Sequence, residues 1–196
     1  TDTLGCYLWK GFDVELNLTP VLPGVHQVQN LAGVVAGLYL LLGGSQISAV
    51  NVDKNFFGTE LIGRFQQVET SLPAHVYVDV GHNHDAAKAL AKNLTLLKPK
   101  TGRLIVLLGM LDDKDSMNFV LELNKVVDDW WLLTLDCDRG LSAEKLQQRI
   151  HSCVSVNECF ENVEHSLDHA LSSLTNQDIM LVTGSFVTVE LFLRAT

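Results

Sequence analysis

Apolar and polar positions change their spacing along this chain of 196 residues. Beyond Thr70, short apolar runs alternate with longer segments whose apolar residues recur every three or four positions. The runs predict strands at 75–80, 103–109, 130–135, 153–156 and 178–183, with an edge strand at 65–69. The periodic segments predict helices at 84–97, 115–127, 142–151, 159–173 and 185–194. This alternation predicts an α/β fold with a mostly parallel, Rossmann-like sheet and helices on both faces.

The first 63 residues show a different pattern. Loose alternation from Tyr7 to Leu18 predicts a strand or hairpin. Helical spacing from His26 to Leu42 predicts a helix that stops at Gly43, and a shorter helix is expected over 48–56. This segment is too small to bury its own apolar surface, so we expect residues 1–63 to expose an apolar face formed by Leu31, Val35, Leu38 and their neighbours.

Composition narrows the class of protein. The hydrophobic fraction of 47% and the charged fraction of 19% are those of a globular protein and exclude disorder. The formal net charge of −9 argues against a nucleic-acid partner, which needs a clustered basic surface. The most apolar window, 31–42, is too short to span a membrane. Four cysteines without C-x-x-C spacing are typical of reduced thiols in a cytoplasmic protein.

The main candidate chemistry follows the predicted strand at 75–80. The sequence continues through Asp79, His82 and Asn83 into an Ala-rich helix. Ligands of open α/β sheets bind outside the carboxyl ends of the strands, so a carboxylate and an imidazole at this point indicate a site. The structural alternative, which geometry alone favours equally, is a helix start capped by Asn83 or Asp85.

Five stretches of the sequence carry a resemblance to one known family. They are LPGVHQVQNLAGVVAGLYLL at 22–41, IGRFQQVE at 62–69, DVGHNHDAAKAL at 79–90, LIVLLGMLDDKD at 104–115 and LVTGSFVTVELFL at 181–193. In this order they resemble the motifs of folylpolyglutamate synthase/dihydrofolate synthase, a branch of the Mur ligase superfamily. The resemblance covers nearly the whole chain.

The resemblance implies a domain organisation. Residues 1–63 would be the C-terminal end of a central ATP-binding domain, 64–70 an interdomain linker and 71–196 a C-terminal glutamate ligase domain. The phosphate loop of the family, G-x-x-x-x-G-K-[ST], does not occur in this sequence. The resemblance therefore implies the C-terminal part of a longer enzyme, inactive when isolated.

The resemblance also implies a reaction and its partners. The family uses ATP and Mg²⁺ to convert a carboxylate of dihydropteroate or a folate into an acyl phosphate, which the amine of L-glutamate attacks. The Mg²⁺ ligands would lie outside this chain, in a parent enzyme that is monomeric and cytoplasmic. No metal, nucleic-acid or membrane site is expected in the chain itself. The pterin contacts also lie outside it, so the choice between dihydrofolate synthesis, polyglutamate extension and both stays open.

The same resemblance implies roles for individual residues. Asp79 and His82 match residues that face the nucleotide and the reacting centre. Ser185 is a further catalytic candidate: it begins the last helix, where backbone N–H groups favour anions. Arg64 matches a linker arginine that contacts ATP, and Asn30 matches a nucleotide-contacting asparagine. His82 could donate a hydrogen bond as a neutral ring or accept a proton from the amine, and the sequence leaves both roles open.

Simpler roles compete with some of these assignments. Arg64 could be a surface residue paired with a nearby acid, and Asn30 could be a helix cap. In the GMLDDKD loop, Asp115 is expected to cap a helix, whereas Lys114 is a candidate for binding the carboxylates of glutamate.

The sequence departs from the family pattern at two positions. The proline that usually follows H-N is His84, and the histidine of G-S-F-H-T-V is Val187. The second change removes a potential acid, base or phosphate contact.

Other functions have less support. A metal site made of His75, His82, His84 and Asp85 would require residues on both sides of a strand-to-helix turn to converge. A nicotinamide site requires G-x-G-x-x-G, but the first strand is followed by D-V-G-H-N-H. The alternative to the ligase is a non-catalytic binding or interaction module with the same fold.

Overall fold

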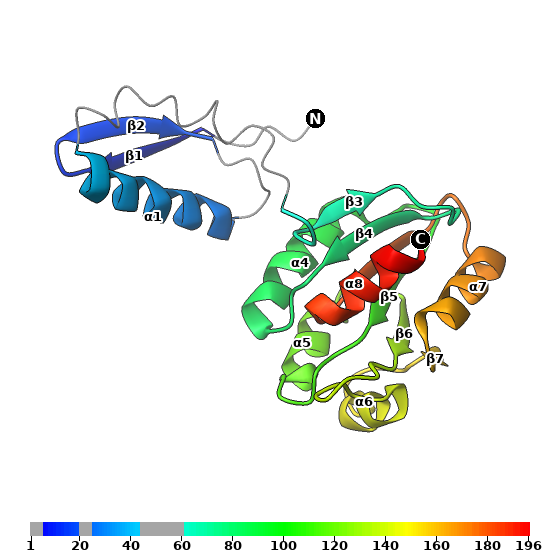
Figure 1. The fold of residues 1–196 in the computed structure, drawn as a ribbon. Coiled ribbons are helices and arrows are strands. Elements are labelled where there is room, and N and C mark those ends of the chain that lie inside the picture. Colours follow the sequence, from blue (N-terminus) through cyan, green and yellow to red (C-terminus); the bar gives the residue numbers. More distant parts are fainter. Residues whose placement is uncertain (1–5, 20–24, 44–60) are drawn as a thin grey trace. The chain divides into compact units, whose positions relative to one another are not determined.

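The computed structural model describes residues 6–19, 25–43 and 61–196, and Figure 1 shows its elements along the chain. The chain divides into two compact units, Thr1–Leu61 and Ile62–Thr196. The larger unit holds the alternating strands and helices. Within the described ranges, every helix is too short or too polar to cross a membrane.

The smaller unit contains an antiparallel hairpin and one long helix. Strands β1 (Tyr7–Gly11) and β2 (Val14–Leu18) form the hairpin, and α1 spans Val25–Leu42. Gly43, with φ of 82°, ends α1 by donating its N–H to Tyr39 O over 2.9 Å. The hairpin and the long helix are confirmed, whereas the helix expected over 48–56 lies outside the described residues.

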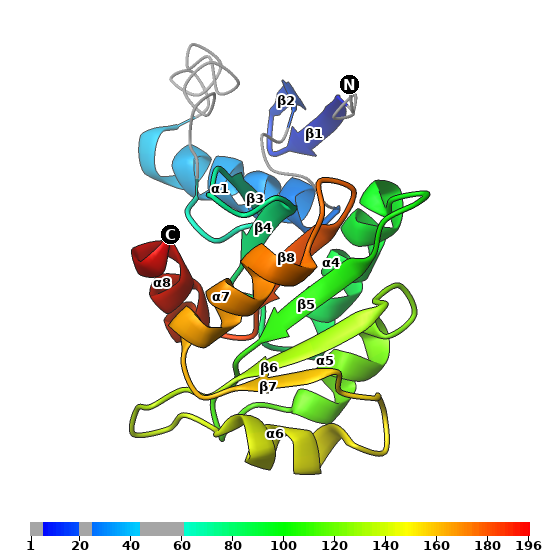
Figure 2. The ribbon, with the colours of Figure 1, turned by 90° about the vertical axis from the view of Figure 1, so that its right-hand side faces the viewer.

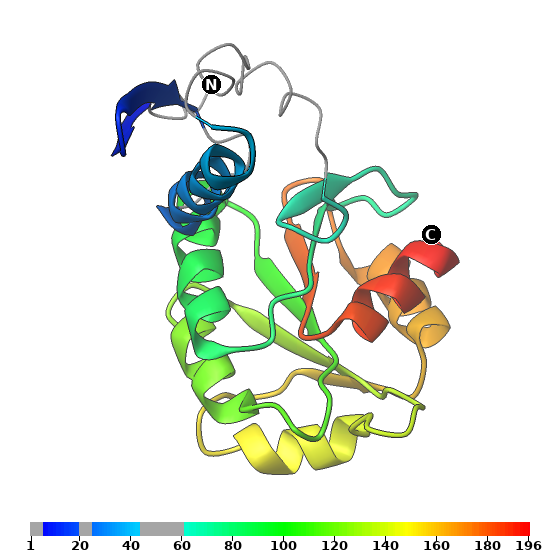
Figure 3. The same ribbon diagram turned by 60° about the vertical axis from the view of Figure 1, so that its left-hand side comes forward.

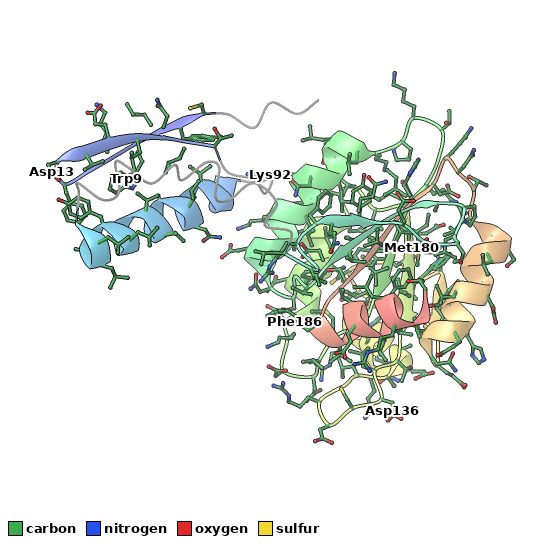
Figure 4. All side chains as sticks on the ribbon, turned by 45° about the horizontal axis from the view of Figure 1, so that its top comes forward. Trp9, Asp13, Lys92, Asp136, Met180 and Phe186 are labelled. Atoms are coloured by element: carbon green, nitrogen blue, oxygen red, sulfur yellow. The ribbon has the colours of Figure 1, made fainter. Side chains whose placement is uncertain are left out.

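The inner face of α1 packs on the hairpin. Val35 is 0% exposed and clusters with Leu18 of β2. The side chain of Trp9 lies between the hairpin and the helix (Figure 4), and Leu31 packs beside it. The expectation of an exposed apolar face is therefore wrong for Val35, which the hairpin covers, whereas Leu31 and Leu38 are half-buried. The exposed apolar side chains of α1 are Val34, Leu40, Leu41 and Leu42.

The larger unit is built on a six-stranded sheet with the order β3-β4-β8-β5-β6-β7 (Figure 2). Its strands are β3 (Gln66–Val68), β4 (His75–Asp79), β5 (Leu104–Leu108), β6 (Asp129–Leu133), β7 (Glu158–Phe160) and β8 (Ile179–Thr183). Strand β3 is antiparallel to β4, and the other adjacent pairs are parallel. The predicted α/β fold is confirmed. The last strand of the chain, β8, lies between β4 and β5.

Helices cover both faces of this sheet (Figure 3). They are α4 (His84–Leu97), α5 (Ser116–Leu123), α6 (Ala143–Ile150), α7 (Val163–Ser173) and α8 (Phe186–Ala195). Helices α4, α5 and α6 lie on one face, and α7 and α8 lie on the other. Successive residues of a strand point to opposite faces, so Val106 packs with the first group while Ile105 and Leu107 pack with the second. All five positions of β5 are consequently buried.

Two predicted boundaries near β7 are wrong. Residues 153–156, expected as a strand, finish the turn after α6: Cys153 and Val154 donate their N–H groups to Ile150 O. Helix α7, expected to begin at 159, begins only after its cap Asn162. Phe160 fits the helical stripe by spacing but belongs to β7, because a buried apolar residue satisfies either pattern.

Asp178 organises the amino edge of the sheet and is 3% exposed. Its Oδ1 accepts the Arg103 N–H at 2.7 Å, and its Oδ2 accepts the Thr175 N–H at 2.9 Å and Arg103 Nη2 at 3.3 Å. Arg103 also donates to Asp129 Oδ2 at 2.9 Å, which ties the starts of β5, β6 and β8 together. Burial raises the pKa of Asp178, but the hydrogen bonds from Arg103 and Thr175 outweigh it and hold the pKa below its usual value.

We predict that Asp178→Asn lowers the free energy of unfolding by about 1–3 kcal/mol at pH 7, because an amide cannot replace a carboxylate that accepts from several donors. A carboxyl group with a depressed folded pKa stabilises the protein above its unfolded pKa of about 3.9, and this contribution is lost as the pH falls through the folded pKa. The difference between wild type and variant should therefore shrink toward pH 3.

Urea unfolding followed by tryptophan fluorescence at both pH values measures this difference. The control is Asp168→Asn on the exposed side of α7. Equal losses in the two variants, or a loss from Asp178→Asn that does not change with pH, would contradict the prediction.

Candidate functional site

The carboxyl ends of β4 and β8 lie side by side. Asp79 of β4 is opposite Thr183 of β8 in the parallel register. Just beyond the strands, the Gly184 N–H donates to Gly81 O over 3.1 Å, and Thr183 Oγ1 donates to the same carbonyl over 3.3 Å. The two turns that carry Asp79, His82 and Ser185 therefore meet at one edge, as parallel strand polarity requires.

The Asp79 carboxylate is 8% exposed and connects two backbone segments. Its Oδ1 accepts the Gly81 N–H at 2.7 Å, within the turn after β4. Its Oδ2 accepts the Phe65 N–H at 2.8 Å, in the segment before β3. Asp79 thus joins the turn that carries His82 to the segment that carries Arg64.

The four residues from Gly63 to Gln66, called the linker turn, are held against the end of β4. Gly63 O accepts the Val80 N–H at 2.9 Å, and the Gly63 N–H donates to Gln66 Oε1 at 3.1 Å. Gly63 has φ of 73° and Phe65 has φ of 45°. A left-handed conformation suits glycine but costs free energy in phenylalanine, so the surrounding contacts must hold Phe65 in place.

Arg64 projects from the linker turn. Its side chain is exposed and makes no ion pair with the residues that the structure describes, so the paired-surface alternative finds no partner there. Within the expected 64–70 linker, Gln66–Val68 forms β3 and pairs with Val76–Val78 of β4. Much of this segment is therefore part of the sheet.

The His82 ring is half-buried, and its Nδ1 lies 2.9 Å from Val80 O. A carbonyl oxygen accepts but cannot donate, so Nδ1 carries the proton and Nε2 of the neutral ring keeps a lone pair. Among the described residues, Nε2 has no hydrogen-bond partner. Of the two roles that the sequence leaves open, this tautomer favours accepting a proton through Nε2.

Ser185 is 3% exposed and caps α8. Its Oγ accepts the Thr188 N–H at 3.0 Å and lies 2.7 Å from Thr188 Oγ1. Because Thr188 Oγ1 donates its own proton to Gly109 O at 2.7 Å, Ser185 must supply the proton between the two hydroxyls. The Ser185 hydroxyl thus holds the start of α8 to the loop after β5, through Thr188.

Gly184 allows this close approach. Its φ is 105°, and a Cβ added to it would lie 2.5 Å from Gly109 O and 2.7 Å from Leu108 Cδ1. Any side chain there would separate the turns after β8 and β5. Phe186, the next residue but one, is 61% exposed and projects from the start of α8 (Figure 4).

The loop 109–115 is tied to α6 at its tip. Lys114 Nζ donates to Asp113 Oδ2 at 2.8 Å, and this hydrogen bond lowers the pKa of Asp113. Arg149 of α6 forms an ion pair with Asp112, and its Nη1 donates to Asp112 O at 2.8 Å. Lys114 would have to exchange Asp113 for a substrate carboxylate in order to bind glutamate.

Two polar residues of the motifs cap helices. Asn83 Oδ1 accepts the Ala86 N–H at 2.9 Å at the start of α4. Asp115 Oδ1 accepts the Asn118 N–H at 3.2 Å at the start of α5, as expected. Asn30 differs: it is exposed in the second turn of α1, and is therefore not the cap of that helix.

The residues considered for a metal site do not converge. His75 begins β4, whereas His82 follows its other end. The His84 ring faces α5, where its Nε2 lies 4.0 Å from Glu122 Oε1. Over the described ranges, no group of three or more His, Cys, Asp or Glu side chains could hold a metal ion. Val187, at the position of the family histidine, is half-buried and packs against the core beneath α7 and α8.

Several parts of this site cannot be recognised from motifs alone. Serine is a typical helix cap, so Ser185 has a sequence signal, but nothing in the sequence indicates that the Thr188 hydroxyl is buried against Gly109 O. The left-handed conformation of Phe65 has no signal, because phenylalanine seldom adopts it.

We predict that Phe65→Gly is more stable than Phe65→Ala by about 0.5–1 kcal/mol, even after the greater unfolded-state entropy of glycine is counted. Both variants lose the ring that stacks on Tyr77, with centroids 5.2 Å apart, so the comparison isolates the backbone. Urea unfolding of the two variants gives the difference. At Glu69, where φ is negative, the order of the Gly and Ala variants should reverse. The same order at both positions would rule out backbone strain at Phe65.

Comparison with known proteins adds to this geometry. Residues 63–186 match the family described as Mur ligase, glutamate ligase domain. The chain is similar to the dihydrofolate synthase/folylpolyglutamate synthase of Haemophilus influenzae, with 34% identity over 208 residues, which cover 94% of this chain and 45% of that protein. The chain therefore spans less than half the length of this relative.

Solved structures of the same kind of protein superpose on the chain. A bifunctional folylpolyglutamate synthase/dihydrofolate synthase with Mn, AMPPNP and L-glutamate bound gives a TM-score of 0.76 at 29% identity, covering 96% of this chain and 43% of that one. Escherichia coli FolC in complex with ADP gives a TM-score of 0.71 at 34% identity, covering 92% of this chain and 41% of that one.

Proposed function

Because this chain belongs to the Mur ligase family, we propose that it is the C-terminal part of an ATP-dependent ligase that adds L-glutamate to dihydropteroate, to folates or to both. The relative from Haemophilus influenzae is named for both activities, and the chain covers 45% of it. The phosphate loop and the Mg²⁺ ligands would lie in the remainder of a monomeric, cytoplasmic enzyme.

The observation that carries this proposal is the combination of features at the carboxyl edge of the sheet. Helices α4 and α8 both begin there, after their caps Asn83 and Ser185, and helix N-termini favour anions. The linker turn presents Arg64, whose guanidinium suits phosphate oxygens. These groups fit the phosphates of ATP, which supplies the phosphoryl group that activates the acceptor carboxylate. Asn30 of α1 is a further residue that would contact the nucleotide.

His82 is the residue we assign to proton transfer. The amine of glutamate attacks the carbonyl carbon of the acyl phosphate, a C–N bond forms, and the C–O bond to phosphate breaks. The amine loses a proton in this step, and His82 Nε2 has the lone pair that can accept it. Lys114 would bind a carboxylate of the incoming glutamate after leaving Asp113.

Asp79 and Ser185 would serve the reaction mainly by placing other groups. Asp79 holds the two segments that present His82 and Arg64. Ser185 holds the first turn of α8, whose N–H groups would face the phosphates. The competing function is a non-catalytic binding module. Two features are also compatible with it: the Ser185 hydroxyl is already hydrogen-bonded to Thr188, and residue 187 is a valine.

We predict that the purified 196-residue chain has no ligase turnover, because the phosphates of ATP would lack their loop and Mg²⁺ ligands. The measurement is ADP release with dihydropteroate or tetrahydrofolate, ATP, Mg²⁺ and L-glutamate. The full-length protein that contains this chain should be active in the same assay. An inactive full-length protein would favour the binding module, and activity of the isolated chain would refute the proposed division of the site.

In the full-length enzyme, we predict that His82→Ala lowers kcat by about 10²- to 10⁴-fold with little change in the KM for ATP, as expected on losing a general base. Arg64→Ala should mainly raise the KM for ATP. His75→Ala, at the opposite edge of the sheet, is the matched control and should leave both constants unchanged. An unaltered kcat for His82→Ala would leave the imidazole as a structural residue of the turn.

A further inference from the structure

The linker turn is held to the larger unit on both sides of Arg64. On one side, Gly63 O accepts the Val80 N–H at 2.9 Å. On the other, the Phe65 N–H donates to Asp79 Oδ2 at 2.8 Å. The turn also closes on itself, because the Gly63 N–H donates to Gln66 Oε1 at 3.1 Å. Arg64 is therefore the exposed tip of a turn whose two flanking residues are both hydrogen-bonded.

Side-chain packing supports the same arrangement. Gly63 is buried, and a Cβ added to it would lie 2.7 Å from Val80 Cγ1, so the backbone runs directly over β4. The Phe65 ring stacks on Tyr77 of β4, and the left-handed φ of 45° turns the chain sharply after Arg64. An unfavourable backbone conformation persists only where its surroundings hold it, and such conformations cluster at functional sites.

The buried carboxylate of Asp79 accepts hydrogen bonds from both the turn after β4 and the linker turn. One oxygen accepts from Gly81, immediately before His82, and the other accepts from Phe65, immediately after Arg64. A shift of either segment would break a hydrogen bond to the same carboxylate. The Asp79 side chain therefore contacts both the His82 turn and the Arg64 turn, and it adds to the backbone contact between Gly63 and Val80 in fixing their spacing.

We propose that the linker turn is a preset arm of the larger unit, in which Asp79 and Gln66 are positioning residues that aim Arg64 at the ligand reached by His82. Arg64 then keeps its place relative to His82 within the larger unit. A backbone held in this way loses little conformational entropy when Arg64 binds an anion, which increases affinity without adding a contact. This inference rests on the proposed function for the identity of the anion, the phosphates of ATP.

Amide hydrogen exchange on the 196-residue chain tests the arm without any ligand. The Phe65 and Gly81 amides should exchange at least tenfold more slowly than in an unfolded chain. Asp79→Ala should remove the protection of both, while the amides of Leu107 and Val182 in the sheet interior report that the fold persists. If Asp79→Ala does not fold, Asp79→Asn keeps one acceptor oxygen and should release one of the two amides. Glu69→Ala, an exposed acid of the same segment, is the control.

A double-mutant cycle in the full-length enzyme tests whether Gln66 acts through Arg64. Gln66→Leu removes the acceptor for the Gly63 N–H and should raise the KM for ATP about fivefold with kcat retained, the scale of one lost hydrogen bond. Gln66→Glu keeps an acceptor oxygen and should restore most of the affinity. In the Arg64→Ala background, Gln66→Leu should have no further effect, because the group that it positions is gone.

The two experiments fail in different ways. Rapid exchange of the Phe65 amide in the wild type, or exchange that Asp79→Ala leaves unchanged, would overturn the arm whatever the enzyme does. Additive effects of Gln66→Leu and Arg64→Ala would overturn the positioning role in an active enzyme. An inactive full-length protein would refute the proposed function, and hydrogen exchange would still decide whether the arm exists.

Discussion

The insertion of β8 between β4 and β5 is the constraint on which the rest of the larger unit depends. This strand pairs in parallel register with β4 on one side and with β5 on the other, although it is the last strand of the chain. Its carboxyl end therefore brings three distant turns together, those after Asp79, Leu108 and Thr183. The short contacts of Gly184 with Gly81 and Gly109 follow from that pairing, and they leave no room for a side chain.

The polar residues at the amino edge of the sheet stabilise the fold, whereas those at the carboxyl edge form the candidate site. At the amino edge, the buried Asp178 and the partly exposed Arg103 form a network that joins the starts of three strands. At the carboxyl edge, polar groups belong to turns and helix starts, and some of them, such as Arg64, are exposed. Strand polarity makes this division possible, because it places all the parallel strand ends that precede helices on one side of the sheet.

The polar residues at the carboxyl edge serve different purposes. Asp79 and Ser185 direct their oxygens mainly at backbone or at neighbouring side chains, so they shape the site. His82 has one ring nitrogen engaged with a carbonyl and the other without a hydrogen-bond partner in the described ranges. Arg64 combines an exposed guanidinium with a constrained backbone. In a site of this kind, some groups contact the ligand and other groups hold them at a fixed spacing. The contacting groups are then placed accurately at the reacting centre.

The amino-acid sequence by itself determined the fold class, the helix at 84–97 and the motifs at the strand ends, because those features depend on local periodicity and on residue type. It also identified Asp115 as a cap and offered Asn83 or Asp85 as the cap of α4, since capping acts within one turn of helix. The sequence could not locate β7, because Phe160 satisfies a helical and a sheet pattern equally well. Only the tertiary structure decided the position of β8, the link from Asp79 to Phe65 and the link from Thr188 to Gly109. Those contacts join residues far apart in the chain, and long-range pairing leaves no periodic trace in the sequence of either partner.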